Sequence, residues 1–257
     1  MSVKVTFLGT GTSQGVPLIA CNCKVCSSNN PLDKRLRTSV KVEVGDTTIV
    51  IDSGPDFRQQ MLRSETKKID ALIFTHEHKD HIAGMDDIRA FNYIHKLPVD
   101  VFASQQVQLA LRREYQYIFA DFKYPGIPEI NLFTIANNQS FKVNDIEIVP
   151  IEVLHYKLPV LGFRIGDFTY ITDANAISDI EKEKIKGSKV LVLNALRHEK
   201  HISHFTLSEA IALVQELNVP EAYFTHISHQ LGLHHEVDAT LPNGMHLAYD
   251  GLSINIG

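Results

Sequence analysis

A cluster of potential metal ligands at the end of a predicted strand constrains this chain more than any other feature. The apolar segment 69–74 has the composition of a buried strand, and the residues that follow it are Thr-His-Glu-His-Lys-Asp-His. The potential ligands among them are His76, His78, Asp80 and His81. Their spacing places four donor groups in a tight arc around one point, whereas a solvated histidine-rich loop would rarely contain so many. We therefore predict a metal centre at the mouth of this strand.

The order of apolar segments predicts an α/β fold. Strand-like ranges are 3–8, 39–44, 47–52, 69–74, 132–135, 146–154, 161–166, 168–172, 190–193, 222–225 and 245–256. Helix-like ranges are 57–64, 85–94, 105–119, 177–186 and 207–217. Strand-rich stretches with helices in each half favour two sheets packed together with helices outside them. No linker or repeat interrupts the pattern, so we expect one domain over residues 1–257.

Composition and charge limit the classes of function. No apolar run approaches the ~20 residues that a membrane-spanning helix needs, and the N-terminal segment reads as a strand rather than a signal peptide. A cytoplasmic protein with no membrane partner is therefore expected. The formal net charge is -5, and proteins that grip long nucleic acid usually carry a basic surface. The charge balance argues against that partner. The oligomeric state stays open, with a homodimer as one arrangement.

Three further candidate ligands stand at the ends of apolar segments. They are His155, Asp173 and His226. Alone, each would more often be a polar residue with an ordinary hydrogen bond, but together they supply the two histidines and one aspartate that two metal sites still lack. Strand ends converge in α/β folds, which allows a shared site. Asp52 also ends an apolar segment, and two interpretations stay open: it orients a ligand histidine, or it caps a turn.

The His-x-His-x-Asp-His run, with the three later residues following in order, resembles the metallo-β-lactamase superfamily of hydrolases. The resemblance covers nearly the whole chain and implies a four-layer αββα sandwich. It also implies two metal sites that share one aspartate. In that scheme His76, His78 and His155 bind one ion, Asp80, His81 and His226 bind the other, and Asp173 bridges both. Two ions ~3.5–4 Å apart activate water for attack at phosphorus. Such ligands suit zinc or manganese, so the catalytic metal stays open.

A second cluster of ligands lies nearer the N-terminus. The three cysteines of the chain are Cys21, Cys23 and Cys26. This spacing is too tight for a disulfide framework and leaves one thiol over. Three thiolates make most of a tetrahedral zinc site, so we interpret residues 21–26 as a zinc knuckle. His229 is the expected fourth ligand, because its odd spacing from His226 turns it to the opposite side of an extended segment. Three buried free thiols are the alternative.

Two longer segments narrow the resemblance. Gly-Thr-Gly-Thr-Ser-Gln-Gly-Val-Pro at 9–17 precedes the knuckle, and Thr-His-Ile-Ser-His-Gln at 225–230 is followed by Leu-Pro-Asn-Gly at 241–244. Both are similar to the phosphoribosyl 1,2-cyclic phosphate phosphodiesterases of phosphonate degradation. That resemblance implies a structural zinc bound by the three cysteines and His229, and it implies that His204 acts at the phosphate. The glycine spacing GxGxxxG, with no helix after it, excludes a dinucleotide-binding fingerprint.

Together these features predict a metal-dependent phosphodiesterase acting on a small, cyclic phosphodiester. A metal-bridging hydroxide would attack phosphorus, Asp80 and Asp173 would keep the metals bound, and His204 would stabilise charge or protonate the leaving oxygen. A tRNA 3′-processing ribonuclease is the first alternative, although the chain has no basic insert to grip RNA. Others are a thioester or β-lactam hydrolase, in which His204 has no clear duty, and a non-catalytic binding protein similar to the pyrroloquinoline quinone carrier. The full ligand set argues against that binding protein.

Two other segments have no settled role. His198, His201 and His204 recur every third residue, which indicates either a third metal site or, as we prefer, one histidine at the centre and two exposed ones. The range 105–128 carries several tyrosine and phenylalanine residues. We expect them in the core, with a lid above the metals as the alternative.

Overall fold

The computed structural model describes residues 2–122 and 124–257, and within these ranges the chain forms two seven-stranded sheets. The strand order is β14-β1-β2-β3-β4-β5-β6 in the first sheet and β13-β12-β11-β10-β9-β8-β7 in the second. The first sheet contains β1 (Val3–Gly9), β2 (Ser39–Val44), β3 (Thr47–Ile51), β4 (Ala71–Ile73), β5 (Val99–Ala103), β6 (Ile130–Thr134) and β14 (Ser253–Ile256). The second contains β7 (Phe141–Val143), β8 (Ile146–His155), β9 (Leu158–Ile165), β10 (Phe168–Ile171), β11 (Val190–Asn194), β12 (Glu221–Thr225) and β13 (Met245–Leu247).

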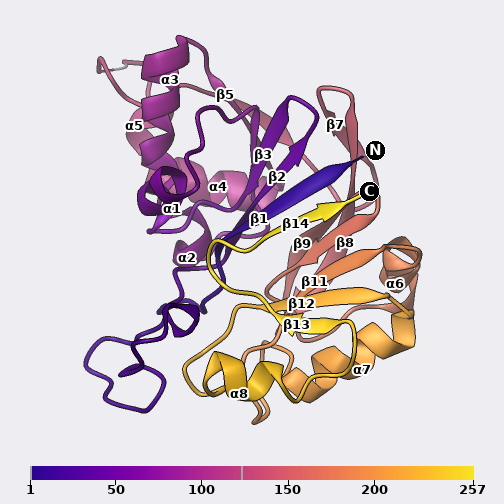
Figure 1. The fold of residues 1–257 in the computed structure, drawn as a ribbon. Coiled ribbons are helices and arrows are strands. Elements are labelled where there is room, and N and C mark those ends of the chain that lie inside the picture. The colour runs from indigo at the N-terminus through magenta and orange to yellow at the C-terminus, as the bar shows by residue number, and fades with distance from the viewer. Residues whose placement is uncertain (1, 123) are drawn as a thin grey trace.

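Helices cover the outer face of each sheet (Figure 1). Those over the first sheet are α1 (Phe57–Arg63), α2 (Lys79–Ile82), the 3-10 helix η2 (Met85–Ile88), α3 (Arg89–His95), α4 (Gln105–Glu114) and α5 (Gln116–Phe119). Those over the second are α6 (Asp179–Ile185), α7 (Leu207–Leu217) and α8 (His234–Asp238), while the 3-10 helix η1 (Pro31–Asp33) lies in the N-terminal loop. The predicted αββα sandwich is confirmed. None of the helices in the described ranges is long and apolar enough to span a membrane.

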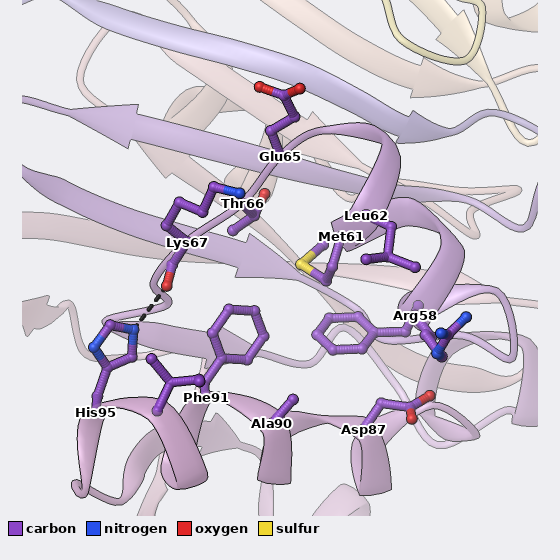
Figure 2. Close-up of a pocket in the computed structure, with 12 residues that line it drawn as sticks. Arg58, Met61, Leu62, Glu65, Thr66, Lys67, Asp87, Ala90, Phe91 and His95 are labelled. Atoms are coloured by element: carbon purple, nitrogen blue, oxygen red, sulfur yellow. Dashed lines mark hydrogen bonds between the residues drawn. The ribbon is translucent and has the colours of Figure 1, made fainter.

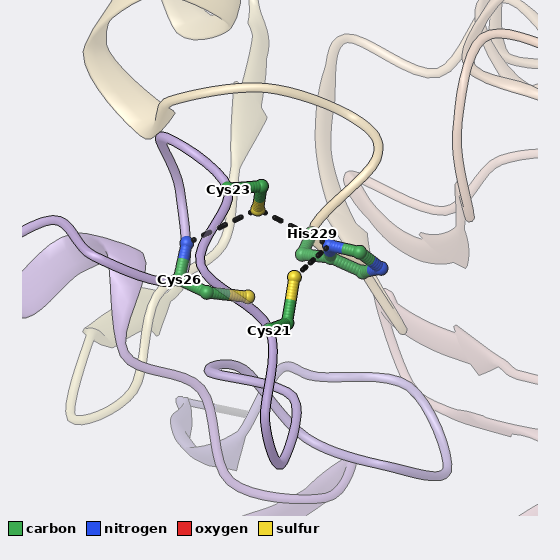
Figure 3. A group of neighbouring side chains, drawn as sticks. All are labelled: Cys21, Cys23, Cys26 and His229. Atoms are coloured by element: carbon green, nitrogen blue, oxygen red, sulfur yellow. Dashed lines mark hydrogen bonds between the residues drawn. The ribbon is translucent and has the colours of Figure 1, made fainter.

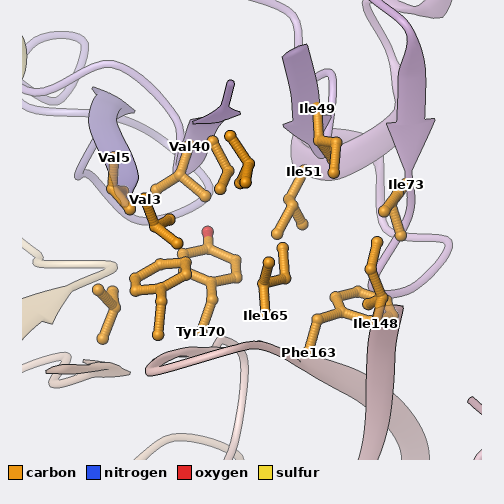
Figure 4. Close-up of a cluster of buried hydrophobic side chains, with 14 of the residues drawn as sticks. Val3, Val5, Val40, Ile49, Ile51, Ile73, Ile148, Phe163, Ile165 and Tyr170 are labelled. Carbon is orange, nitrogen blue, oxygen red and sulfur yellow. The ribbon is translucent and has the colours of Figure 1, made fainter. Parts of the chain in front are cut away.

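Aliphatic and aromatic side chains fill the space between the two sheets (Figure 4). Ile49 and Ile51 of β3 point into this core, where Phe163 and Tyr170 of the second sheet face them. Val50, between the two isoleucines, points the other way and packs under the helices. Since side chains alternate along a strand, a strand covered on both faces must be apolar throughout. The continuous Ile-Val-Ile run of β3 follows from this position.

Helix α7 shows how local sequence sets an element and its burial. The Thr206 hydroxyl accepts a hydrogen bond from the Glu209 amide, and the Glu209 carboxylate accepts one from the Thr206 amide at 2.9 Å, which completes a capping box. Buried residues then recur every three or four positions on the face against the second sheet. The helix ends at Asn218, whose left-handed backbone has φ 52°. The predicted helix over 207–217 is confirmed.

Other segments differ from the prediction. The sequence pattern misses β5, β7, α2 and α8, because none of them has more than five residues and a period cannot emerge over so short a segment. The predicted helix over 105–119 divides at Tyr115, which leaves the helical conformation while its hydroxyl donates to the Ile82 carbonyl at 2.6 Å. The predicted strand over 245–256 also divides. Its first part, β13, joins the second sheet, and its last part, β14, joins the first.

The two ends of the described chain meet at one edge of the sandwich. Val3 of β1 pairs with Ile256 of β14, and Figure 1 shows these ends side by side. Farther along β1, Gly9 pairs with Ser39 of β2, and the next residue of β2, Val40, pairs with Ile51 at the carboxyl end of β3. The carboxyl end of β3 therefore lies at the opposite edge from the chain ends.

That opposite edge collects the ends of several strands. β3 runs parallel to β4, and β10, β11 and β12 run parallel to one another, so their carboxyl ends point the same way. The loops after β3 and β4 pack closely, since Ser53 donates to the His81 carbonyl at 2.8 Å and Gly84 donates to the Ser53 carbonyl at 2.7 Å. A Cβ atom on Gly54 would lie 2.1 Å from the Asp80 carbonyl oxygen, so only glycine permits this approach.

Candidate metal centres

Seven histidine and aspartate side chains from four separate segments of the chain gather at this edge. They form two groups of potential ligand atoms, each within 4.8 Å of one another. One group contains His76, His78, His155 and Asp173, and the other contains Asp80, His81, Asp173 and His226. The structure thus brings together all seven residues singled out in the sequence, in the grouping that the family resemblance implies.

One carboxylate oxygen lies between the two groups. Asp173 Oδ2 is 3.8 Å from His76 Nε2, 3.4 Å from His81 Nε2 and 3.1 Å from His226 Nε2. Its other oxygen accepts a hydrogen bond from the Thr172 hydroxyl at 2.7 Å, which fixes the carboxylate. Asp173 is therefore placed to contact two cations at once.

Asp52 orients the histidines of both groups. Its Oδ2 accepts from His81 Nδ1 at 2.7 Å and from the Thr75 hydroxyl at 2.9 Å, while Oδ1 accepts from the Thr75 amide at 2.9 Å. The Thr75 oxygen in turn lies 2.9 Å from His76 Nδ1. With Nδ1 engaged, each ring directs Nε2 at the centre. This confirms the interpretation of Asp52 as an orienting residue. The sequence predicts no role for Thr75, which stands directly before the His-x-His-x-Asp-His run.

His155 is held by a backbone group that no sequence pattern reveals. Its Nδ1 lies 2.9 Å from the Ser203 carbonyl oxygen, which leaves Nε2 for the centre. His78 lies opposite, with Nδ1 3.1 Å from His76 Nε2, and it is the exposed member of its group. The open side of the centre therefore lies at His78.

The backbone is strained at the residues that end these strands. Asp52 and His226 are both buried and have φ of 65° and 57°, and Tyr156, directly after His155, has φ 58°. Residues other than glycine reach this left-handed region at some energetic expense, and such strain collects at functional sites. Here it turns the chain sharply after a strand and aims the side chain across the edge of the sheet.

The electrostatics of the centre favour a bound cation. Burial alone would lower the pKa of His226, but Asp173 and Asp80 raise it to about 9. Burial would raise the pKa of Asp173, yet His226 and His81 hold it well below its usual range. His81 Nε2 and His226 Nε2 are buried and face carboxylates without hydrogen-bond geometry. Imidazole nitrogens directed at buried carboxylates fit divalent metal ions, which require neutral histidines and ionised aspartates.

His204 lies beside both groups and belongs to neither. Its ring centroid is 4.7 Å from that of His226 and 4.7 Å from that of His155, and only 7% of the residue is exposed. Burial lowers the pKa of His204 to about 3, and the neighbouring histidines act in the same direction while Asp173 opposes them. The ring is therefore neutral at physiological pH, so it can act as a hydrogen-bond donor without carrying charge.

The cysteine knuckle forms a second, separate cluster (Figure 3). His229 Nδ1 lies 3.5 Å from Cys21 Sγ and 3.3 Å from Cys23 Sγ, and the Cys26 thiol points into the same space. The His229 contact, helped by the Cys26 amide, lowers the pKa of Cys23 to about 6. A thiolate among sulfur and imidazole donors fits a tetrahedral zinc ion.

The route to His229 differs from the sequence interpretation. Strand β12 ends at Thr225, and the chain bends at His226 rather than continuing as a strand. Ile227 then bridges to Gly11, and its amide donates to the Thr10 carbonyl at 2.8 Å. The predicted separation of the two histidines holds, but a bend and this contact produce it, not the alternation of an extended segment.

The histidines of the 198–204 loop and the aromatic residues of 105–128 agree only in part with the prediction. His198 is exposed, but His201 is partly buried and its ring centroid is 5.1 Å from that of His204, so the expectation of two exposed histidines is wrong for His201. In the aromatic segment Tyr115 is buried as predicted, whereas Phe122 and Tyr124 are exposed. Neither His198 nor His201 belongs to a ligand group in the described ranges.

A large hollow elsewhere on the surface lacks this chemistry. A groove of about 580 Å³ lies between α1 and α3, with Met61, Leu62 and Phe91 along it (Figure 2). Its histidine, His95, bonds the Lys67 carbonyl at 2.7 Å. The metal-ligand clusters lie at the sheet edge instead, so the volume of this groove does not mark it as the functional site.

A family model supplies independent evidence. The model described as Beta-lactamase superfamily domain matches residues 47–227, a range that includes all seven histidine and aspartate residues of the centre. The chain belongs to the metallo-β-lactamase superfamily. The superfamily fold implies divalent metals at the histidine and aspartate groups. The resemblance drawn from the sequence is confirmed.

The individual proteins that resemble this chain carry different functional names. The crystal structure of a diphosphatase from the PhnP family superposes with TM-score 0.93 at 38% identity, covering 100% of this chain and 98% of that one. An octanoyltransferase of Porphyromonas gingivalis is 38% identical over 97% of this chain. A ribonuclease Z of Prochlorococcus marinus is 24% identical over 78% of this chain. The chain spans about half the length of the octanoyltransferase, 51%, and 60% of the ribonuclease Z.

Proposed function

We propose that this chain hydrolyses small phosphodiesters at a binuclear centre. The observation that carries the proposal is Asp173 Oδ2, which lies between two complete ligand groups with a neutral histidine beside them. The diphosphatase and ribonuclease Z relatives support it, since both names denote hydrolysis at phosphorus.

In this proposal the ligands follow the two groups. His76, His78 and His155 would hold one ion, Asp80, His81 and His226 would hold the other, and Asp173 would be shared between them. Zinc or manganese would suit these donors. Such a pair of ions lowers the pKa of water and binds the oxygens of a phosphoryl group. The cysteines and His229 would hold a separate zinc, which would stabilise the fold and take no part in the reaction.

The protein side chains at the centre have distinct proposed roles. Asp80 and Asp173 keep negative charge at the centre, because the histidines hold the pKa of each carboxylate below its ordinary value even though burial opposes this. His204 is neutral and donates a hydrogen bond from a ring N–H to the phosphoryl or leaving oxygen, which stabilises the negative charge there and leaves the ring unchanged. The attacking water supplies its hydroxyl to phosphorus and its proton to the leaving alcohol, so water adds across the broken P–O bond. The strained Asp52 and His226 keep the geometry in place before substrate arrives.

We propose a cyclic diester as the substrate. The loops at 9–17 and 225–230 resemble those of cyclic phosphate phosphodiesterases. The chain carries net charge -5 and no basic insert, which disfavours the alternative of tRNA processing. A non-catalytic binding protein is the other alternative, and it would leave the histidine and aspartate groups without metal.

The test is hydrolysis by protein loaded with zinc or manganese. We expect turnover of bis(p-nitrophenyl) phosphate and of nucleoside 2′,3′-cyclic phosphates, and at least a 100-fold loss of kcat in Asp173→Ala and His78→Ala. His246→Ala, an exposed histidine on β13, serves as the matched control. Unchanged rates in the first two variants would refute the centre, and about one metal per chain would favour the binding protein.

A specific observation favours a second candidate reaction. The diphosphatase is similar over the whole chain at 38% identity, so a diphosphate bridge is the alternative scissile bond. A sugar nucleotide substrate with that bridge, assayed beside the cyclic diesters, separates the two. The octanoyltransferase name belongs to a protein about twice as long as this chain, and the ligand groups here suit hydrolysis rather than acyl transfer.

A further inference from the structure

A short loop covers one side of the catalytic centre. Leu196 donates to the Phe205 carbonyl at 3.0 Å, which closes the loop at its base, and the Ser203 carbonyl lies 2.9 Å from His155 Nδ1. Arg197 braces it from within, through the Glu199 and Lys200 carbonyl oxygens, each at 3.2 Å. The loop is thus fixed to the centre at one point and internally supported, so its side chains have defined positions.

Three imidazoles follow one another from the centre outward into this loop, the first two stacked and the third tilted against the second. The His226 and His204 ring centroids are 4.7 Å apart with an interplanar angle of 21°, and those of His204 and His201 are 5.1 Å apart at 36°. His226 and His204 are buried, whereas His201 is partly exposed. His201 is therefore the outermost ring of a column that begins at a proposed metal ligand.

The hydrogen bonds of His201 select one tautomer. The Ser203 amide donates to His201 Nδ1 at 3.3 Å, and the Ser203 hydroxyl lies at the same distance from that nitrogen. Because Nδ1 accepts, the proton of the neutral ring is on Nε2. Burial, followed by the charge of Arg197, lowers the pKa of His201, which agrees with a neutral ring. Within the described ranges Nε2 has no protein partner among the hydrogen bonds of this ring.

We propose that His201 determines substrate specificity by donating its Nε2–H to an oxygen on the alcohol part of the diester, and that it selects diesters bearing hydroxyl groups. The inference rests on the proposed function. His204 lies next to the ligands His155 and His226 and His201 lies on its outer side, so a diester bound at the ligand groups would place its alcohol part toward His201. Tyr156 and Ile202 are exposed, and each is next in sequence to one of the two residues that join this loop to the centre, His155 and Ser203. A sugar offers both a hydroxyl for the imidazole and an apolar face for these exposed side chains.

The test compares two substrates and two substitutions. His201→Phe keeps the ring and removes the donor, and His201→Gln keeps a donor near the Nε2 position. His198→Phe, the same change at an exposed position of the same loop, is the matched control. The substrates are a nucleoside 2′,3′-cyclic phosphate, whose ribose carries a free 5′-hydroxyl, and bis(p-nitrophenyl) phosphate, which carries no hydroxyl.

For His201→Phe we expect about a tenfold rise in KM for the cyclic nucleotide, as loss of one hydrogen bond predicts, with kcat within about twofold. The aromatic diester should show neither change, His201→Gln should restore most of the loss, and His198→Phe should match the parent protein. Equal losses on both substrates, or no difference from His198→Phe, would overturn the inference. So would a parent protein that cleaves bis(p-nitrophenyl) phosphate but no hydroxyl-bearing diester. A metal-loaded parent protein that cleaves neither refutes the proposed function itself.

Discussion

Replacing Asp52 by asparagine tests how the centre is held, because the change keeps the size of the side chain and alters only its donors and charge. Asp52 is fully buried, and its two oxygens accept three hydrogen bonds, at 2.7 Å from His81 Nδ1 and at 2.9 Å from each of two Thr75 groups. An asparagine offers one oxygen and one NH2 group in place of two acceptors. One side of the new amide must therefore face a donor.

Both orientations of the asparagine harm the site. With NH2 toward His81, the ring must accept at Nδ1, so its proton moves to Nε2, the atom that faces Asp80 and Asp173. A protonated nitrogen cannot bind a metal. With NH2 toward the Thr75 amide, two buried donors oppose each other, which costs about 1–3 kcal/mol. Loss of such an orienting partner typically weakens metal binding about 10–100-fold, or about 1.4–2.8 kcal/mol.

The assay is a competition titration against a chromogenic chelator, with Asp46→Asn as control. Asp46 is an exposed residue in the turn between β2 and β3, so the same change there should leave affinity unaltered. We expect weakened binding at the group containing His81 and a turnover that recovers at high metal concentration. Equal affinity in the two variants, with both folded by thermal denaturation, would refute this account of Asp52.

Four further outcomes follow from the two clusters. Cys23→Ser should lower Tm by about 4–8 °C, which corresponds to a loss of about 2 kcal/mol in the free energy of unfolding, while the protein that stays folded keeps most of its turnover. A loss of turnover at unchanged Tm would contradict the structural role of the cysteine cluster. His204→Ala should lower kcat about 100-fold and leave the metal content measured by elemental analysis unchanged. Chelation should abolish activity before it removes zinc from the saturated Cys3His cluster, as atomic absorption on timed samples will show. In metal-free protein the thiolate absorbance should rise in separate steps as the pH is raised. Cys23 should ionise near pH 6, because its contact with His229 lowers its pKa, and Cys26 should ionise near pH 11, because burial raises its pKa.

The ligand residues could be predicted because their signal is local. The His-x-His-x-Asp-His run and the cysteine knuckle each place several donors within a few positions. His155, Asp173 and His226 each stand at or just after the end of an apolar strand. Parallel strands that end at one edge bring such residues together whatever their separation along the chain. The four-layer fold follows from the same order of segments.

The residues that orient the ligands could not be predicted. The Ser203 group that holds His155 is a backbone carbonyl, which every residue has. Thr172 and Thr75 are common residue types whose role depends on rotamer and distance. The bend at His226 arises from contacts with the loop around Thr10, more than 200 positions away, and no period in the sequence encodes it. Long-range packing therefore supplied what local pattern could not.

The pairing of Val3 with Ile256 has a practical consequence for how this chain can be joined to other proteins. Since both chain ends lie on the side of the sandwich remote from the strand ends that carry the ligands, a tag or a second enzyme fused at either end would leave substrate access free. Immobilisation through either end should likewise present the reactive edge to solution. The layout suits the molecule to serve as an interchangeable module within a longer polypeptide.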